Sequence, residues 1–136
     1  MEIRFRVSGK PEPQARPRTF NQGGRFVTFS KKSAFRKQVY AEALKNRPRM
    51  SLDRALGLTL RFRMPRPKTG HKGELWHITR SDLSNLIKGV EDGINDTGIW
   101  RDDCLIAFLR AEKTYSDDFV GVEIGIIELE NVPEAK

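Results

Sequence analysis

The stretch DLSNLIKGVEDGIN, residues 82–95, predicts the central helix of the fold. Its apolar side chains recur at helical spacing and therefore form one buried stripe. They are Leu83, Leu86, Ile87, Val90 and Ile94. Asn85, Lys88 and Asp92 fall on the opposite face, where Lys88 and Asp92 have the spacing of an i,i+4 ion pair. With Asp82 as its N-cap, this pattern by itself is that of an ordinary amphipathic helix.

Asp102 and Asp103 open the next predicted element, a strand that runs to about Thr114. Adjacent residues of a strand point to opposite faces, so only one of the two carboxylates can readily meet Asp82. Apolar residues follow on both faces of this strand, so the pattern does not decide which one. Carboxylates held close together repel one another unless a cation lies between them, and a divalent metal is the usual solution. The acids therefore predict a metal site where the helix and the strand meet.

The remaining pattern predicts one α+β domain over residues 1–136, with a mixed sheet of about five strands and two main helices. The other strands are expected at residues 2–7, 25–29, 56–64 and 120–129. A first helix is expected to run from an N-cap at Ser30 to about Asn46.

Two segments are not expected to form helices or strands. Three prolines exclude regular structure over residues 9–18. Residues 65–80 carry Pro, Gly, Lys and His without periodicity and predict a long exposed loop. Loops of this length inside a compact domain tend to be functional.

Charge is distributed unevenly along the chain, whose formal net charge is +7. Residues 1–50 hold thirteen Lys and Arg against three acids, whereas residues 51–136 hold twelve against fifteen. A basic half beside an acidic half fits a protein in which one part contacts phosphates and another binds cations. Charge alone supports a nucleic-acid hypothesis and nothing narrower.

Several classes of protein are excluded or disfavoured by composition. Cys104 is the only cysteine, which excludes an internal disulfide and a multi-cysteine zinc site. The longest apolar runs are far shorter than the ~18 residues that a membrane span needs. No basic-then-apolar leader precedes the first strand, so the cytoplasm is the expected location. No RNP-type or KH-type signature is present, which disfavours an RNA-binding role.

The acids, the lysine and their spacing resemble the RusA family of Holliday-junction resolvases, which bacteria, prophages and phages carry. The family pattern is Asp-Leu-Asp-Asn-Leu-x-Lys, an acid four residues later, and then Trp/Phe-x-Asp-Asp. Here it corresponds to residues 82–88, then Asp92, then residues 100–103. Residues 9–18 and 110–113 also look like phage-borne members, so the resemblance covers nearly the whole chain.

The resemblance implies a RusA-like fold and a homodimeric, Mg²⁺-dependent endodeoxyribonuclease, for which Mn²⁺ could substitute. Such an enzyme nicks two opposed strands of a four-way DNA junction in recombination and repair, inside a bacterial or phage-infected cell. Asp82 and Asp103 correspond to metal-binding acids, and Lys88 corresponds to an essential lysine. We expect Lys88 to supply positive charge to the reacting phosphate or the leaving group, and Asn85 to orient a bound water.

Ser84 departs from the family pattern, in which this position is a second Asp. A hydroxyl is a neutral and weaker ligand for a hard cation than a carboxylate is. Ser84 could bind the metal through a water, or Asp92 or Asp102 could compensate as a ligand. An alternative is a catalytically weakened protein that binds junctions or branched DNA. A further alternative is a less selective nuclease that acts on flaps or forks.

Basic residues of the N-terminal half and of the long loop are the expected DNA contacts, because such contacts position phosphates without reading sequence. They are Arg16, Arg18, Arg25, Lys31, Lys32, Arg66, Lys68 and Lys72. Trp76 could stack on unpaired bases at the crossover or anchor the loop on the core. His71 and His77 are expected to be plain polar residues rather than metal ligands.

Overall fold

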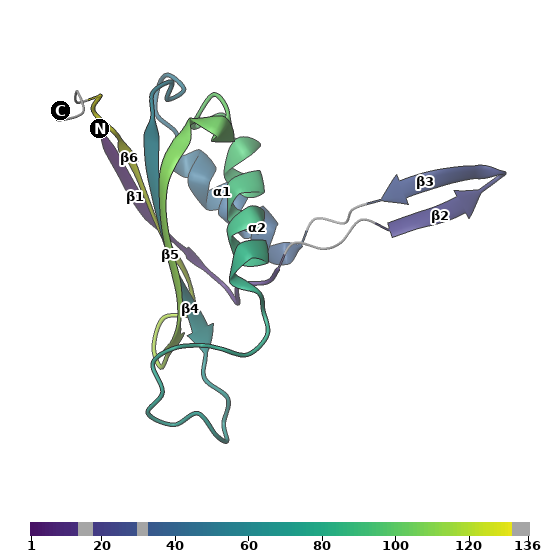
Figure 1. Cartoon of the computed structure of the whole chain (residues 1–136), viewed down its shortest axis with the longest axis vertical. Coiled ribbons are helices and arrows are strands. Elements are labelled where there is room, and N and C mark those ends of the chain that lie inside the picture. The colour runs from purple at the N-terminus through teal and green to yellow at the C-terminus, as the bar shows by residue number, and fades with distance from the viewer. Residues whose placement is uncertain (14–17, 30–32, 132–136) are drawn as a thin grey trace, which may run out of the picture.

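The computed structural model describes residues 1–13, 18–29 and 33–131. A four-stranded mixed sheet with two helices forms the body, and a two-stranded hairpin extends away from it (Figure 1). This arrangement confirms the expected α+β class with two main helices. Within the described ranges, no helix is both long enough and apolar enough to cross a membrane.

The sheet has the strand order β1-β6-β4-β5. Its strands are β1 (Glu2–Ser8), β6 (Gly121–Glu128), β4 (Leu56–Pro65) and β5 (Ile106–Ser116). β6 runs antiparallel to both β1 and β4, whereas β5 runs parallel to β4. Parallel strands need a crossover connection, and the second helix lies within the connection from β4 to β5. β5 is consequently an edge strand of the sheet.

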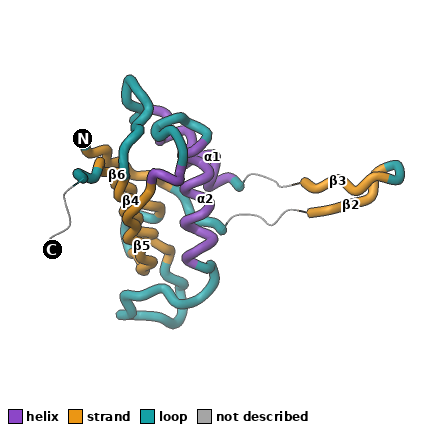
Figure 2. Tube along the Cα trace, turned by 45° about the horizontal axis from the view of Figure 1, so that its top comes forward, coloured by secondary structure: helices purple, strands orange, loops and turns teal. Residues whose placement is uncertain are grey.

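Two helices, α1 (Ala34–Lys45) and α2 (Leu83–Asn95), pack against each other on one side of the sheet (Figure 2). The apolar stripe of α2 is buried as expected, because Leu86, Val90 and Ile94 have no exposed surface. The core lies between these helices and the inward side chains of β4 and β6. No helix of the described residues covers the opposite face of the sheet.

The first helix begins later than expected. Its N-cap is Ser33, whose Oγ accepts a hydrogen bond from the Arg36 N–H at 3.1 Å. Ser30, the expected N-cap, lies outside the described residues. Gly93 of α2 faces this helix, and a Cβ there would lie only 3.0 Å from Val39 Cγ1. The glycine therefore permits the close approach of the two helices.

One strand of the hairpin was not expected. β3 (Arg25–Phe29) forms where predicted, and it pairs with β2 (Arg18–Gln22). β2 contains a single large apolar residue and follows a proline-rich run, so its sequence carries little strand signal. Gly23 and Gly24 form the turn with φ angles of 61° and 84°, values that only glycine adopts without strain.

The strand predicted from Asp102 also begins later than expected. Residues Asp103–Leu105 form a short 3₁₀ turn, η1, and β5 starts at Ile106. Asp102 is the N-cap of this turn, and its Oδ1 accepts a hydrogen bond from the Cys104 N–H at 2.8 Å. The two aspartates are therefore in a cap and a turn, and the strand-alternation argument does not apply to them.

Candidate functional site

The first turn of α2 places Asp82 and Ser84 at the surface. Asp82 is the N-cap, as expected, and its Oδ1 accepts a hydrogen bond from the Ser84 N–H at 3.0 Å. Lys113 of β5 supports this end of the helix, because its Nζ donates to the carbonyl oxygens of Ser81 at 2.6 Å and Thr79 at 3.0 Å. Burial lowers the pKa of Lys113, and the nearby Asp82 carboxylate opposes that effect. A carboxylate, a hydroxyl and an ammonium group thus lie close together.

The next turn of α2 carries the motif lysine. Lys88 Nζ lies 3.5 Å from Asp92 Oδ1, which confirms the expected i,i+4 ion pair. The Lys88 side chain is 59% exposed, whereas that of Asp92 is only 18% exposed. Asn85 is half-buried one turn before Lys88. The ammonium group of Lys88 is accessible to a phosphate despite its ion pair.

The far end of α2 holds Asp103 through a chain of hydrogen bonds. The buried Trp100 donates from Nε1 to Asn95 Oδ1 at 2.5 Å, and Asn95 donates from Nδ2 to Asp103 Oδ2 at 3.0 Å. Asp103 is half-buried and directed toward the helix, whereas Asp102 is exposed. The bond from the Cys104 N–H lowers the pKa of Asp102. The structure therefore distinguishes the two aspartates, which the sequence could not.

Glu91, in the C-terminal half of α2, is an acidic residue that the sequence analysis did not identify. Burial raises the pKa of Glu91, and the negative charge of Asp103 raises it further. Lys88 opposes this shift. Glu91 precedes Asn95 by four residues, so the i,i+4 rule could have placed it on the same face of α2 as the amide that holds Asp103. Glu91 and Asp103 form a second group of acids.

The structure does not bring the two predicted metal-binding acids, Asp82 and Asp103, together within one chain. Asp82 caps the first residue of α2, and Asp103 is bonded to Asn95, the last residue of this 13-residue helix. At 1.5 Å per residue the two helix ends are about 20 Å apart, whereas oxygen ligands of one Mg²⁺ lie about 4 Å apart or less. Nor does any part of the described chain group three or more His, Cys, Asp or Glu side chains around a possible ion. Asp82 and Asp103 of one chain therefore lie too far apart to share one Mg²⁺ ion.

The long loop is tied to the body by Arg66. Its guanidinium bonds to both carboxylate oxygens of Asp117, at 2.7 and 3.3 Å, and to the carbonyl oxygens of His71 and Glu74, at 2.5 and 2.9 Å. Four of the five donors of this side chain are therefore used within the protein. Arg66 thus holds the loop in place and has a single N–H left for a phosphate.

The other predicted DNA contacts are spread over the surface. Arg25, Lys68 and Lys72 are exposed, and Trp76 is 54% exposed although its backbone bridges to Thr114. Arg18 is the first residue of β2, and its side chain lies outside the described part of the structure. Three others, Arg16, Lys31 and Lys32, lie outside the described residues. His77 is buried against Tyr115, and His71 Nδ1 lies 2.8 Å from Glu74 Oε2.

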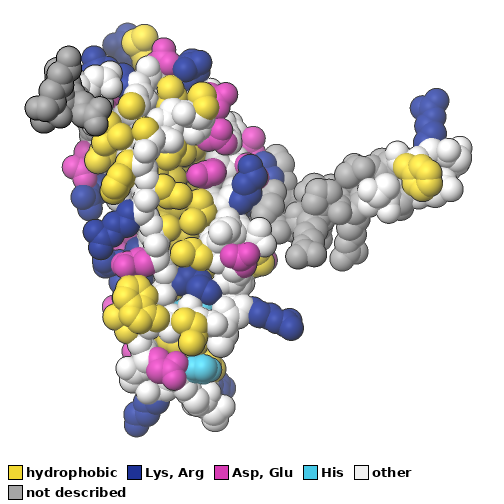
Figure 3. All heavy atoms as spheres, viewed as in Figure 1, with side chains coloured by type: hydrophobic (Ala, Val, Ile, Leu, Met, Phe, Trp, Pro, Cys, Tyr) yellow, Lys and Arg dark blue, Asp and Glu magenta, His cyan; other side chains and the backbone are white. Residues whose placement is uncertain are grey.

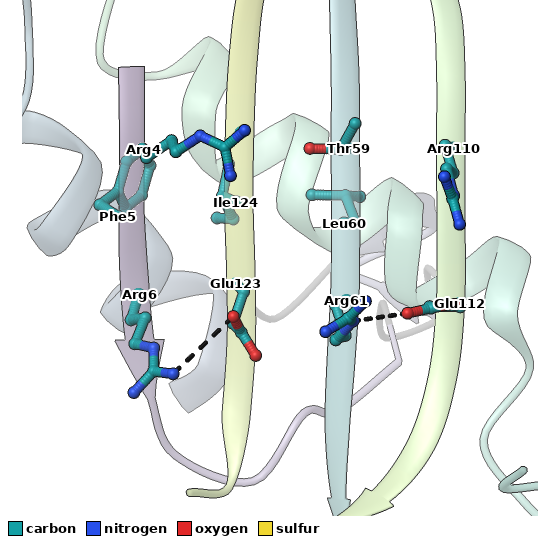
Figure 4. Close-up of a pocket in the computed structure, with 11 residues that line it drawn as sticks. Arg4, Phe5, Arg6, Thr59, Leu60, Arg61, Arg110, Glu112, Glu123 and Ile124 are labelled. Carbon is teal, nitrogen blue, oxygen red and sulfur yellow. Dashed lines mark hydrogen bonds and ion pairs between the residues drawn. The ribbon is translucent and has the colours of Figure 1, made fainter. Parts of the chain in front are cut away.

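The helix-free face of the sheet carries arginines that sequence reasoning did not single out. They line a shallow hollow of about 540 Å³ (Figure 4) and are Arg4, Arg6, Arg61 and Arg110. Arg6 pairs with Glu123 at 3.8 Å and Arg61 with Glu112 at 2.5 Å, and Arg4 pairs with Glu2. These pairs neutralise most of the positive charge of the face. The alternation of arginine with apolar residues in the predicted strands could have revealed it.

Comparisons with known proteins identify the family of the chain. The family model described as endodeoxyribonuclease RusA matches residues 8–127. An uncharacterized protein of Bacillus subtilis strain 168, YqaN, is 29% identical over 128 residues, which cover 85% of this chain and 89% of that protein. A protein of Lactococcus phage r1t, named crossover junction endodeoxyribonuclease rusA, is 24% identical over 132 residues, which cover 94% of this chain and 98% of that protein. The chain belongs to the endodeoxyribonuclease RusA family, and it is an endonuclease.

Proposed function

We propose that the protein is a homodimeric nuclease that resolves four-way DNA junctions by nicking two opposed strands symmetrically. The observation that carries this proposal is the family match over residues 8–127, in a chain whose motif residues lie at the surface of α2. The name of the phage relative, a crossover junction endodeoxyribonuclease, supports the junction as the substrate. Paired nicks on a two-fold junction require two sites related by two-fold symmetry, which supports a C2 dimer.

The N-terminal end of α2 is suited to a phosphate. A helix N-terminus presents unpaired backbone N–H groups and a positive partial charge, both of which favour an anion. The exposed ammonium of Lys88 adds a full positive charge, and we assign it to stabilising the charge that develops on the phosphate. Asp82 is the carboxylate nearest to this end of the helix.

We also propose that cleavage depends on Mg²⁺, with Mn²⁺ as a substitute. Such an ion supplies an activated water and neutralises developing charge, and carboxylate oxygens are the ligands it prefers. Asp82, Ser84 and Asp103 are the proposed ligands, although the 13-residue α2 keeps Asp82 and Asp103 apart within one chain.

Asp82→Asn tests the nuclease directly, because asparagine is as good an N-cap as aspartate and preserves α2. Wild-type protein should release paired nicks from a labelled four-way junction in Mg²⁺, and Asp82→Asn should release ~10²-fold less or none. The matched control is Glu42→Gln, which changes a half-buried acid of α1 paired with Lys45 and should leave cleavage normal. Equal product from wild type and Asp82→Asn contradicts the proposal, and equal cleavage of linear duplex contradicts the junction as the substrate.

A second candidate function is branched-DNA binding with little cleavage, and Ser84 is the observation that favours it. This exposed hydroxyl stands where the family has a carboxylate. If the protein is a nuclease, Ser84→Asp should raise its affinity for Mg²⁺. The cleavage rate of this variant should equal or exceed that of the wild type. Junction binding by wild type without product, together with cleavage by Ser84→Asp, would identify the binding protein.

DNA is proposed to approach over the exposed cations Arg25, Lys68 and Lys72, with Trp76 available for stacking on unpaired bases. Contacts of this kind release counterions, so the logarithm of the junction affinity should fall linearly with the logarithm of salt concentration. Lys68→Ala should reduce that slope by about one ion contact. An affinity that does not change with salt contradicts this surface.

A further inference from the structure

The β2–β3 hairpin stands away from the rest of the molecule. Figure 1 shows both strands projecting beyond the helices and the main sheet, and they form a sheet of their own. Among the described residues, β2 and β3 pack extensively only with each other. An isolated two-stranded hairpin is marginally stable in water, because it has no core to bury. A ribbon that the body does not cover therefore indicates a partner outside the chain.

The charge of this segment identifies the class of partner. Between Glu12 and Glu42 the sequence contains seven Lys and Arg and no Asp or Glu. A segment with charges of one sign repels a second copy of itself and attracts a polyanion. The proposed function already supplies a polyanion of this kind, which is DNA.

A hydrogen bond and two glycines fix the shape of the tip. Asn21 Oδ1 accepts a hydrogen bond from the Gly24 N–H at 3.1 Å, and Gln22 pairs with Arg25 in the strand register. Gly23 and Gly24 have the positive φ angles that a tight hairpin turn requires. With five residues in each strand, the ribbon is about 17 Å long, and its strands are about 5 Å apart. The hairpin is a narrow, preformed wedge.

A large aromatic ring lies just behind this tip. Phe26 is 79% exposed, and the side chain of Arg25 beside it is exposed as well. Figure 3 shows a hydrophobic and a basic side chain near the tip of the hairpin, beyond the body. Neighbouring residues of a strand point to opposite faces, so the ring and the guanidinium lie on opposite sides of the ribbon. One side can stack on a base while the other contacts a phosphate.

Two features favour the centre of a branched DNA over the groove of a duplex. Gly23 and Gly24, at the very tip, have no side chains with which to read base edges. An aromatic ring enters an intact duplex only by separating stacked bases, which costs free energy. That cost is least for bases that are already unpaired, as at a branch point. Phe26 therefore gains more from stacking at a branch than along a duplex.

We propose that the β2–β3 hairpin is an arm that enters the centre of a branched DNA, where Phe26 stacks on an unpaired base and Arg25 contacts a phosphate. Phe26 is then a residue that determines the preference for branched over linear DNA, and it lies outside the α2 motif. The substrate of the arm, branched DNA, rests on the proposed function. Binding by the arm requires neither a metal nor a motif acid, so it is measurable without cleavage.

Binding in EDTA tests the arm. Fluorescence anisotropy gives the affinity of the full chain for a labelled four-way junction and for a linear duplex of the same sequence. Phe26→Ala should weaken junction binding about 10-fold or more and change duplex binding by less than about two-fold. Met50→Ala, which truncates an 80% exposed residue outside the hairpin, is the matched control and should change neither affinity. Equal junction affinity in Phe26→Ala and wild type overturns the proposal, as does an equal loss on both DNAs.

Two further variants separate the ring from the strand that carries it. Phe26→Trp retains an aromatic ring and should keep the junction affinity of the wild type. Phe26→Val retains strand propensity without an aromatic ring and should lose affinity as Phe26→Ala does. Wild-type junction binding by Phe26→Val would show that the residue only stabilises the ribbon, and it would overturn the stacking role.

Salt dependence tests the role of Arg25. Arg25→Gln should lower the slope of log affinity against log salt by about one ion contact, whereas Phe26→Ala should leave that slope unchanged. The same slope in wild type and Arg25→Gln overturns the phosphate contact.

A fluorescent adenine analogue that is quenched by stacking reports on the bases at the crossover. Wild type should raise its fluorescence in the junction, and Phe26→Ala should not, because only the ring takes the base out of its stack. Sedimentation of Phe26→Ala should match that of the wild type. A changed oligomeric state would place Phe26 against a second copy of the chain and overturn the proposal.

Failure of the arm and failure of the proposed function are distinguishable. If Phe26 supports selective junction binding but the wild type cuts no junction in Mg²⁺, the nuclease fails and the arm stands. If the wild type cuts junctions and Phe26→Ala binds them as tightly as the wild type does, the arm fails and the nuclease stands.

Discussion

At the scale of single residues, Lys88 has a structural role and a proposed catalytic role that one variant separates. Its i,i+4 ion pair with Asp92 lies at the helix surface and the Lys88 side chain is largely exposed, so Lys88→Ala should change the free energy of unfolding by only about 0.5 kcal/mol or less. If its charge stabilises the reacting phosphate, cleavage of a four-way junction should fall ~10²-fold or more. Lys45→Ala, which removes a similar pair on α1, is the control. Near-normal cleavage by Lys88→Ala would refute the catalytic role.

Asn95 is a positioning residue for Asp103. Asn95→Asp keeps an acceptor for the buried Trp100 N–H but loses the donor to Asp103 and repels it. We expect cleavage and Mg²⁺ affinity to fall about 10-fold or more, as for other supports of metal ligands, with Trp100 still buried by fluorescence. Asn95→Ala should in addition lose about 1–3 kcal/mol of stability, because the indole N–H is left unpaired. Unchanged Mg²⁺ affinity in Asn95→Asp contradicts this role.

Local chemistry explains which residue contacts could be predicted. The Asp82 cap and the Lys88–Asp92 pair depend on residues within four positions, and the sequence predicted both. The Asp103 side chain points toward α2 because it bonds to Asn95 and lies in the η1 turn. The sequence did not reveal this turn, because the residues that follow it have the pattern of a strand. The role of Arg66 depends on Asp117, fifty-one positions away in the sequence, so its charge alone suggested DNA.

At the scale of elements, the burial of His77 in the long loop should lower the stability of the protein at acidic pH. Burial and the charge of Lys113 lower the pKa of His77 from its ordinary value of 6.5. The unfolded chain therefore binds a proton more readily than the folded one, so stability falls as the pH drops below about 6.5. Between pH 7.5 and 5.5, the free energy of unfolding should decrease less in the His77→Gln variant than in the wild type. The midpoints of urea unfolding at the two pH values measure this difference. An identical acid loss in both proteins would contradict this linkage.

Elements with strong periodicity were predictable, and those defined by pairing were not. The alternation of apolar and polar residues in β4 and the apolar stripe of α2 are patterns of residues close together in the sequence. Both elements form where expected. β2 has little pattern of its own and exists as a strand through its pairing with β3. The predicted start of β5 was too early. Asp102 accepts a hydrogen bond from the Cys104 N–H and caps a 3₁₀ turn, so residues 103–105 do not form a strand.

At the scale of the whole molecule, the edge of β5 should control the oligomeric state. Leu109→Lys places a charge at the open edge and should shift sedimentation toward a monomer, while far-UV circular dichroism stays unchanged. Paired nicking of a four-way junction should fall together with the dimer fraction, because two symmetric nicks require two sites. Met50→Lys, which replaces an 80% exposed residue outside the sheet, should leave the dimer intact. A Leu109→Lys dimer as stable as wild type would contradict the interface.

The sequence predicted a dimer through the family resemblance but could not indicate its surface. The strand order β1-β6-β4-β5, which leaves β5 at an edge, is a property of long-range pairing. The same order and the length of α2 separate Asp82 from Asp103, a distance that the spacing of residues along the chain does not reveal. The separation of these two acids therefore became apparent only in three dimensions.

The most direct test of the account is the position of a bound ion in a crystal of the dimer soaked with Mn²⁺. Anomalous density should appear beside Asp82, twice per dimer and related by the two-fold axis. Density at neither Asp82 nor Ser84, in a crystal that binds Mn²⁺ elsewhere on the protein, would contradict the account.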